Sequence, residues 1–109
     1  MIRNLLLGLL ALTGLSAAQS PQKFTGLITD EMCALVGHAH MKMGPTDADC
    51  VRACVASHGA SYVLVVGKDV YNLSDQKTPE KFAAHNVIVA GTLDTKTKTI
   101  AVQSIAPAK

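Results

Sequence analysis

Five short segments rich in β-branched and aromatic residues constrain the fold of this chain most strongly. They span residues 24–29, 62–66, 70–73, 87–93 and 99–105. The second and third are joined by the turn at residues 67–69, and the fourth and fifth by the turn at residues 94–97, so each pair predicts a β-hairpin. Gly26 and Gly91 lie inside predicted strands, where a missing side chain permits strong coiling or close backbone approach.

Between the third and fourth strands, Thr78 and Pro79 predict a short helix that runs to about His85, with Thr78 as N-cap and Pro79 in the first position. The resulting order of elements is that of the OB-fold, a small, partly open, five-stranded barrel. A β-sandwich fragment or another small barrel would also accommodate it. We therefore expect a mainly β, α+β fold: an OB-like barrel with a helical, cysteine-containing insertion between the first and second strands.

The first 18 residues have the three parts of an export signal. Arg3 supplies the positive charge, residues 5–15 are apolar, and residues 16–18 are small. The apolar run is shorter than the roughly 20 residues that a membrane-spanning helix needs. We expect cleavage after Ala18, a single domain over residues 19–109 without a membrane span, and a periplasmic or secreted location.

The composition of the mature chain argues against a nucleic-acid-binding protein. The chain has ten Lys and Arg against eight Asp and Glu, and Arg3 lies in the signal segment, which leaves nine against eight. There is no Trp, and the aromatic residues are two Tyr and two Phe. Neither a basic surface nor a base-stacking platform is expected. The oligomeric state is left open.

Most of the unusual chemistry falls in the insertion, residues 30–60. Residues 31–36 are expected to form a short helix capped by Thr29 or Asp30. A second helix starts after Pro45 at Thr46, which begins a capping-box pattern, and ends at Gly59. The residues between the two helices are expected to form a loop.

Three cysteines are predicted to converge within this insertion. Cys50 and Cys54 are four residues apart, so they share one face of the second helix, the face expected to pack on the barrel. Their side chains are too far apart for a disulfide within an intact helix. Cys33 is the remaining cysteine and is expected to join Cys50 and Cys54 in one group. Three thiolates with His38 or His40 as fourth ligand would make a tetrahedral Zn²⁺ site.

Two features leave the occupant of this site open. Met41 and Met43, beside the two histidines, favour Cu(I), which prefers thiolate and thioether ligands. Alternatively, export to an oxidising compartment favours a disulfide from Cys33 to Cys50 or Cys54, which would contribute about 3 kcal/mol and leave one thiol over.

No enzymatic activity is expected from the sequence. Cys33 and His38 lack a third orienting group, and acidic residues beside Cys33 would raise the pKa of its thiol. His58 and His85 are more simply explained as surface residues, His58 as a charge near the C-terminus of its helix.

Five motifs resemble those of a family of small, uncharacterised exported bacterial proteins. They are G-x-I-x-D-x-x-C, C-x-x-x-C, G-A-x-Y-V-L-V, V-Y-x-L-S-D-Q and V-x-V-x-G-T-L, here at residues 26–33, 50–54, 59–65, 70–76 and 87–93. The resemblance covers most of the mature chain and implies an OB-like exported domain without assigning an activity. The combined expectation is a binding module for a transition metal, Cu or Zn. The alternative is a structural or interaction domain that is stapled by a Cys33 disulfide and binds a partner of the cell envelope.

Overall fold

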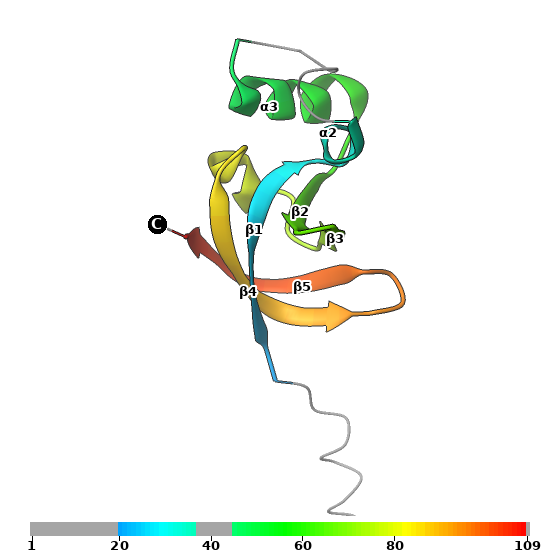
Figure 1. Cartoon of the computed structure of the whole chain (residues 1–109), viewed down its shortest axis with the longest axis vertical. Coiled ribbons are helices and arrows are strands. Elements are labelled where there is room, and N and C mark those ends of the chain that lie inside the picture. The colour runs from blue at the N-terminus through cyan, green and yellow to red at the C-terminus, as the bar shows by residue number, and fades with distance from the viewer. Residues whose placement is uncertain (1–19, 37–44, 109) are drawn as a thin grey trace, which may run out of the picture.

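The computed structural model describes residues 20–36 and 45–108 (Figure 1). In chain order its elements are β1 (Gln22–Asp30), α2 (Glu31–Val36), α3 (Asp47–His58), β2 (Tyr62–Val66), β3 (Asp69–Leu73), the 3-10 helix η1 (Thr78–Phe82), β4 (Asn86–Asp94) and β5 (Thr99–Pro107). The five predicted strands are confirmed, with ends that differ from prediction by at most two residues.

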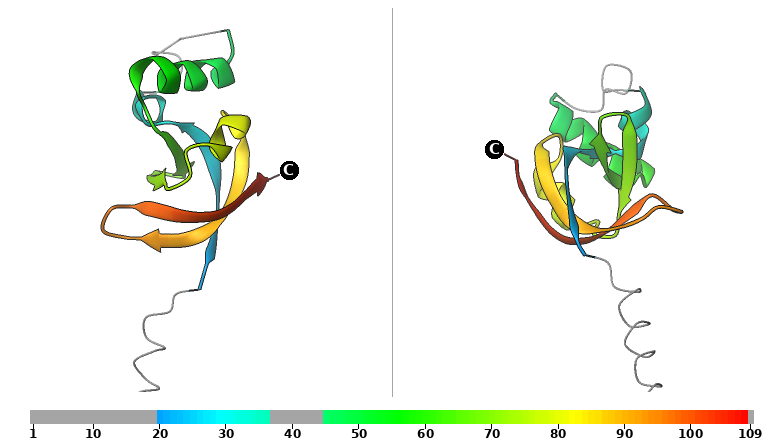
Figure 2. Two further views of the ribbon diagram at one scale, coloured as in Figure 1. Left: turned by 180° about the vertical axis from the view of Figure 1, so that it is seen from behind. Right: turned by 60° about the horizontal axis from the view of Figure 1, so that its bottom comes forward.

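The strands form one mixed sheet that closes into a ring in the order β1-β2-β3-β5-β4. The long strand β1 pairs antiparallel with β2 through its second half and with β4 through its first half. The two hairpins are also antiparallel, and the ring closes where β3 meets β5 in a short parallel pairing at Asn72–Thr99 and Leu73–Ile100. A mainly β, α+β architecture is thus confirmed (Figure 2).

The inside of the ring is filled by aliphatic side chains. Val87 and Val89, two residues apart on β4, are fully buried, as expected for alternating positions of a strand with one apolar face. Ile100 on β5 and Leu64 on β2 are also fully buried and belong to the same cluster. Val51 of α3 joins this cluster, so the helical insertion is anchored to the core of the ring.

The two glycines within strands lie where neighbouring backbones come close. A Cβ on Gly26 would collide with the carbonyl oxygen of Val65, and one on Gly91 with the carbonyl oxygen of Ala101. The pairing of β4 with β5 also shifts register between Ala90 and Gly91. Both positions therefore need a residue without a side chain. This agrees with the close backbone approach predicted for glycines inside strands.

The short helix predicted between β3 and β4 is confirmed, but its end at about His85 is wrong. The structure has a 3-10 helix that ends at Phe82. Asp75 Oδ1 accepts hydrogen bonds from the N–H groups of Lys77 and Thr78 at its start, so Asp75 takes the capping role predicted for Thr78. The helix stops because the backbone after it hydrogen-bonds to β1. Ala84 N–H donates to Ile28 O, and Ile28 N–H donates to His85 O. Ala84 has a positive φ of 63°, which is incompatible with helix continuation.

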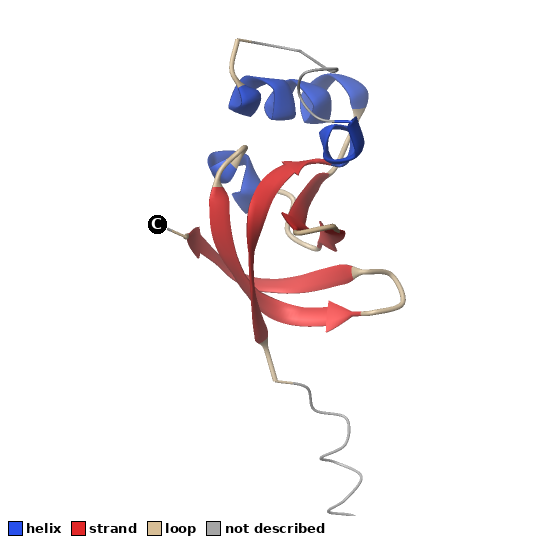
Figure 3. Cartoon of the chain, viewed as in Figure 1, coloured by secondary structure: helices blue, strands red, loops and turns tan. Residues whose placement is uncertain are grey.

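Both helices of the predicted insertion lie between β1 and β2 in sequence and sit together at one end of the ring (Figures 1 and 3). Arg52 Nε on α3 donates to Glu80 O of η1 at 3.1 Å, which ties the longer helix to the connection between β3 and β4. Among the described residues, no helix has the length and apolar character needed to span a membrane.

Candidate metal centre

Cys33, Cys50 and Cys54 lie together in a buried cluster between the two helices. Their exposed fractions are 4, 2 and 0%, and their Sγ atoms all lie within 4.8 Å of one another. The Sγ atoms of Cys33 and Cys50 are 3.7 Å apart. The convergence predicted from the sequence is therefore confirmed, and the three sulfur atoms are spaced as a group that can hold one metal ion.

The caps of the two helices bring the cysteines into this arrangement. Asp30 Oδ2 accepts hydrogen bonds of 3.0 Å from the N–H groups of Met32 and Cys33, so Asp30 caps α2. At the start of α3, Thr46 Oγ1 accepts from Asp49 N–H and donates to Asp49 Oδ2. These reciprocal contacts start the helix one turn before Cys50.

The C-terminal end of α3 then returns the chain to the ring. Gly59 adopts the left-handed conformation with φ of 68°, and its N–H donates to Cys54 O, as expected for a glycine at this position. Ala60, which packs against the cysteines, follows directly. The turn places the start of β2 beside the end of β1, where Glu31 N–H donates to Ser61 O.

The sequence predicted that the helix face with Cys50 and Cys54 packs on the barrel. This prediction is wrong, because the cysteines do not face the core of the ring. Cys50 and Cys54 form a separate cluster with Cys33 and Ala60, while the neighbouring Val51 points into the ring. A helix presents its i and i+4 residues on one side and its i+1 residue about 100° away, so one helix serves both clusters. The thiols are thereby removed from the aliphatic core and gathered against α2.

Burial makes the thiols reluctant to ionise in the absence of a cation. It is the main cause that raises the pKa of Cys33, and the adjacent Asp30 carboxylate and Cys50 raise this pKa further. Burial followed by the charge of Asp30 likewise raises the pKa of Cys54. Neutral thiols are poor nucleophiles, whereas a bound metal cation deprotonates its thiol ligands outright. The thiols therefore stay protonated in the absence of a cation, and a metal ion that binds them has to displace their protons.

Asp30 is a member of the site that the sequence argument recognised only as a candidate cap and as a cause of a raised Cys33 pKa. Its side chain is 0% exposed. Oδ2 accepts the two backbone hydrogen bonds of the cap, while Oδ1 is buried without a hydrogen-bond partner among the described residues. The signal available in the sequence was its position three residues before Cys33.

The remaining predicted ligands fall into two groups. His38, His40, Met41 and Met43 lie outside the described residues. His58 and His85 are both exposed and lie outside the buried thiol group. His85 Nδ1 is 2.9 Å from Ala83 O, a local backbone contact.

The disulfide predicted as an alternative is not formed in the described part of the chain. The 3.7 Å between the Cys33 and Cys50 sulfur atoms exceeds the roughly 2.05 Å of an S–S bond, yet it places Cys33 beside a specific partner. All three sulfur atoms lie within 4.8 Å of one another, so Cys33 has both Cys50 and Cys54 near it.

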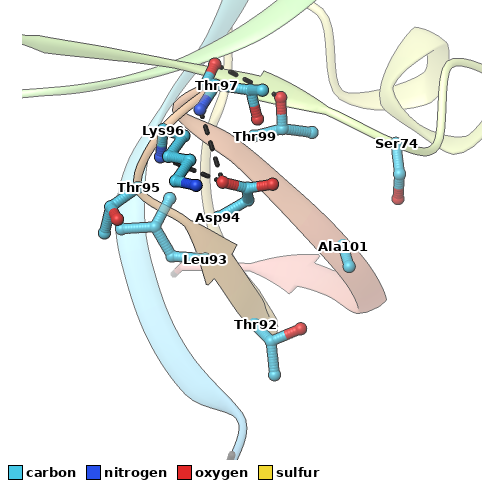
Figure 4. Close-up of a pocket in the computed structure, with 9 residues that line it drawn as sticks. All are labelled: Ser74, Thr92, Leu93, Asp94, Thr95, Lys96, Thr97, Thr99 and Ala101. Atoms are coloured by element: carbon cyan, nitrogen blue, oxygen red, sulfur yellow. Dashed lines mark hydrogen bonds between the residues drawn. The ribbon is translucent and has the colours of Figure 1, made fainter.

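A hollow on the surface of the ring lies away from the thiol cluster and is lined by different kinds of residue. It has a volume of about 680 Å³ and is lined chiefly by polar residues of the β4–β5 hairpin, including Thr92, Thr97 and Thr99 (Figure 4). Asp94 Oδ1 accepts hydrogen bonds from the N–H groups of Lys96 and Thr97, which fixes the turn of the hairpin. This hollow has no thiols and no buried polar group that needs a ligand.

No protein-family model, curated protein or solved structure matches this chain significantly. The function must therefore be argued from the site itself.

Proposed function

We propose that the protein is an exported, OB-like domain that binds one transition-metal ion, Zn or Cu, through the thiolates of Cys33, Cys50 and Cys54. The observation that carries this proposal is the group of three buried Sγ atoms within 4.8 Å of one another. Three thiolates are a common part of structural Zn²⁺ sites and also suit Cu(I). The sequence nominates His38 or His40 for the fourth position.

The OB-like assignment is supported by the five-stranded closed ring and by the helix-containing connection between β3 and β4. Export is supported by the three-part pattern of residues 1–18. In an exported protein, a metal bound to all three sulfur atoms would also protect them from oxidation. A small domain of some 90 residues gains from such a staple, because its core alone is modest.

The competing function is a structural or interaction domain of the envelope, stapled by a disulfide from Cys33 to Cys50 or Cys54. The 3.7 Å separation of the Cys33 and Cys50 sulfur atoms is the observation in its favour. A disulfide would join only two of the three buried thiols of this cluster. A metal site uses all three thiols and is therefore the better explanation of their convergence.

Metal titration of reduced protein separates the two functions. The metal site predicts one equivalent of Zn²⁺ or Cu(I) and loss of binding in C50S and in C54S, because the remaining ligands cannot complete the site. H58A is the matched control, since the exposed His58 lies outside the thiol group, and it should bind as the parent does. H38A or H40A should weaken binding. Unchanged binding in C50S and C54S would refute the site.

A further inference from the structure

We infer that Met32 is a ligand of this site and that its thioether, in place of an imidazole, completes a set of sulfur donors that selects Cu(I) over Zn²⁺. This role rests on the proposed function and decides between the two metals that it names. It follows from three observations: the packing of Met32 against the thiols, the cap that holds it beside Cys33, and the kinds of donor at the cluster.

The first observation is that Met32 packs against the thiol cluster itself. Cys33, Cys50, Cys54 and Ala60 form this cluster, and Met32 is the partly buried apolar side chain that packs against it within residues 20–36 and 45–108. The aliphatic core of the ring is a separate cluster with its own apolar neighbours. The side chain of Met32 is therefore placed at the thiols and not in the interior of the ring.

The second observation is that one cap holds Met32 and Cys33 together. Asp30 Oδ2 accepts hydrogen bonds of 3.0 Å from both backbone N–H groups, which fixes the two residues at the start of α2. Both side chains therefore extend from a backbone that is ordered before an ion arrives. Such preorganisation lowers the entropy cost of binding, and the three rotatable bonds of a Met side chain let its sulfur adjust to the ion.

The third observation concerns the kinds of donor at the cluster. Structural Zn²⁺ sites take four ligands from Cys, His and carboxylate side chains. Among side chains of these kinds in the described part of the chain, the group at this place consists of three cysteine sulfurs. The further donor that packs on it is the thioether of Met32. Thioethers bind Cu(I) and are not ordinary Zn²⁺ ligands, so the donors gathered here suit Cu(I).

The charge and position of the thioether agree with this role. Burial already raises the pKa of Cys33 and of Cys54, and an uncharged donor adds no further negative charge to the group. The cysteines are 0 to 4% exposed, whereas Met32 is only partly buried, so its side chain lies between the closed thiol group and solvent. A flexible, polarisable donor at this boundary can close over an ion that the thiolates hold.

The first test compares M32L with the parent in the full mature protein. Leu has nearly the volume of Met, so M32L keeps the packing and removes the sulfur atom. M41L/M43L is the matched control, because it removes the other two thioethers of residues 19–109 and leaves Met32 in place. Each reduced protein is titrated without oxygen with Cu(I) and with Zn²⁺ against a competing chelator. Thermal melts without metal report whether each variant is folded.

The second test needs no change at position 32. In M41L/M43L, Met32 is the one methionine left in residues 19–109, so selenomethionine labelling of the mature protein places a single selenium atom there. X-ray absorption at the selenium edge of the Cu(I)-loaded protein reports whether copper is bonded to this atom. A copper neighbour at bonding distance is expected.

We expect M32L to bind Cu(I) at least about 10-fold more weakly than the parent, since loss of an outer-shell partner alone costs that much, and to bind Zn²⁺ as the parent does. M41L/M43L should keep the parental affinity for both ions. An equal loss for both ions in M32L, or a selenium edge without bonded copper, would overturn the inference and leave the proposed function standing. So would Cu(I) binding that is kept in M32L and lost in H38A/H40A. Failure of the parent to bind either ion would refute both.

Discussion

Replacing Val89 with Asp should unfold the domain or bring it close to unfolding at neutral pH. Val89 is 0% exposed, and on β4 it pairs with Phe24 of β1 and with Ile105 of β5, so an introduced carboxyl has no route to solvent. Losing the buried valine side chain costs about 2 kcal/mol. Holding the new carboxyl neutral at pH 7, some three pKa units above its ordinary value, costs about 4 kcal/mol more.

The combined cost of about 6 kcal/mol compares with a total stability of roughly 4 to 13 kcal/mol for a domain of some 90 residues. The sign of its pH dependence is fixed, because the introduced carboxyl has a higher pKa in the folded state than in the unfolded state. Its penalty is absent below about pH 4 and grows as the pH rises. V89D should therefore recover most of the 4 kcal/mol between pH 7 and pH 4, measured relative to the parent by urea unfolding.

K96D is the control, because Lys96 is exposed in the turn between β4 and β5. It should melt within a few degrees of the parent, whereas V89D and I100D should lose their cooperative transition at pH 7. A K96D variant less stable than V89D would refute the assignment of Val89 to the interior.

Three further predictions test other parts of the account. Q76A should destabilise the domain by about 1 to 3 kcal/mol in urea unfolding, because Gln76 accepts from Tyr62 N–H and donates to Tyr62 O; the exposed Q103A should have no measurable effect. D75A should lower stability at pH 7, and this loss should shrink as the pH falls below the ordinary range of an aspartate, because the Thr78 hydrogen bonds lower the pKa of Asp75 and stabilise its charged form; an effect of D75A that does not change with pH would contradict this. The intact mass of exported protein should correspond to a chain that begins at Gln19, and a product that retains residues 1–18 would overturn the export argument.

The strands and hairpins were predictable from the sequence because they depend on local signals. Alternation of buried residues on β4 and turn residues between β4 and β5 are visible within a few positions of each other. The convergence of the three cysteines was also predictable, since Cys50 and Cys54 share a helix face and the insertion has little room to place Cys33 elsewhere.

The errors arose where distant residues decide the local conformation. The 3-10 helix ends early because Ile28 of β1 hydrogen-bonds to the backbone of Ala84 and His85, more than fifty residues away. The residues next to Asp30 in the sequence predict that it caps a helix. Its burial, in contrast, follows from the pairing of Asp30 with Tyr62 on β2. Its unpartnered oxygen could not have been inferred without the fold.

The most direct test of the account is a joint count of metal and reactive thiols in protein purified from its native compartment. The account predicts one equivalent of metal per chain, with Cys33, Cys50 and Cys54 all unreactive toward a thiol reagent until a chelator is added, after which three thiols react in denaturant. One reactive thiol in denatured protein before reduction, three after reduction and no stoichiometric metal would contradict it and establish the disulfide in its place.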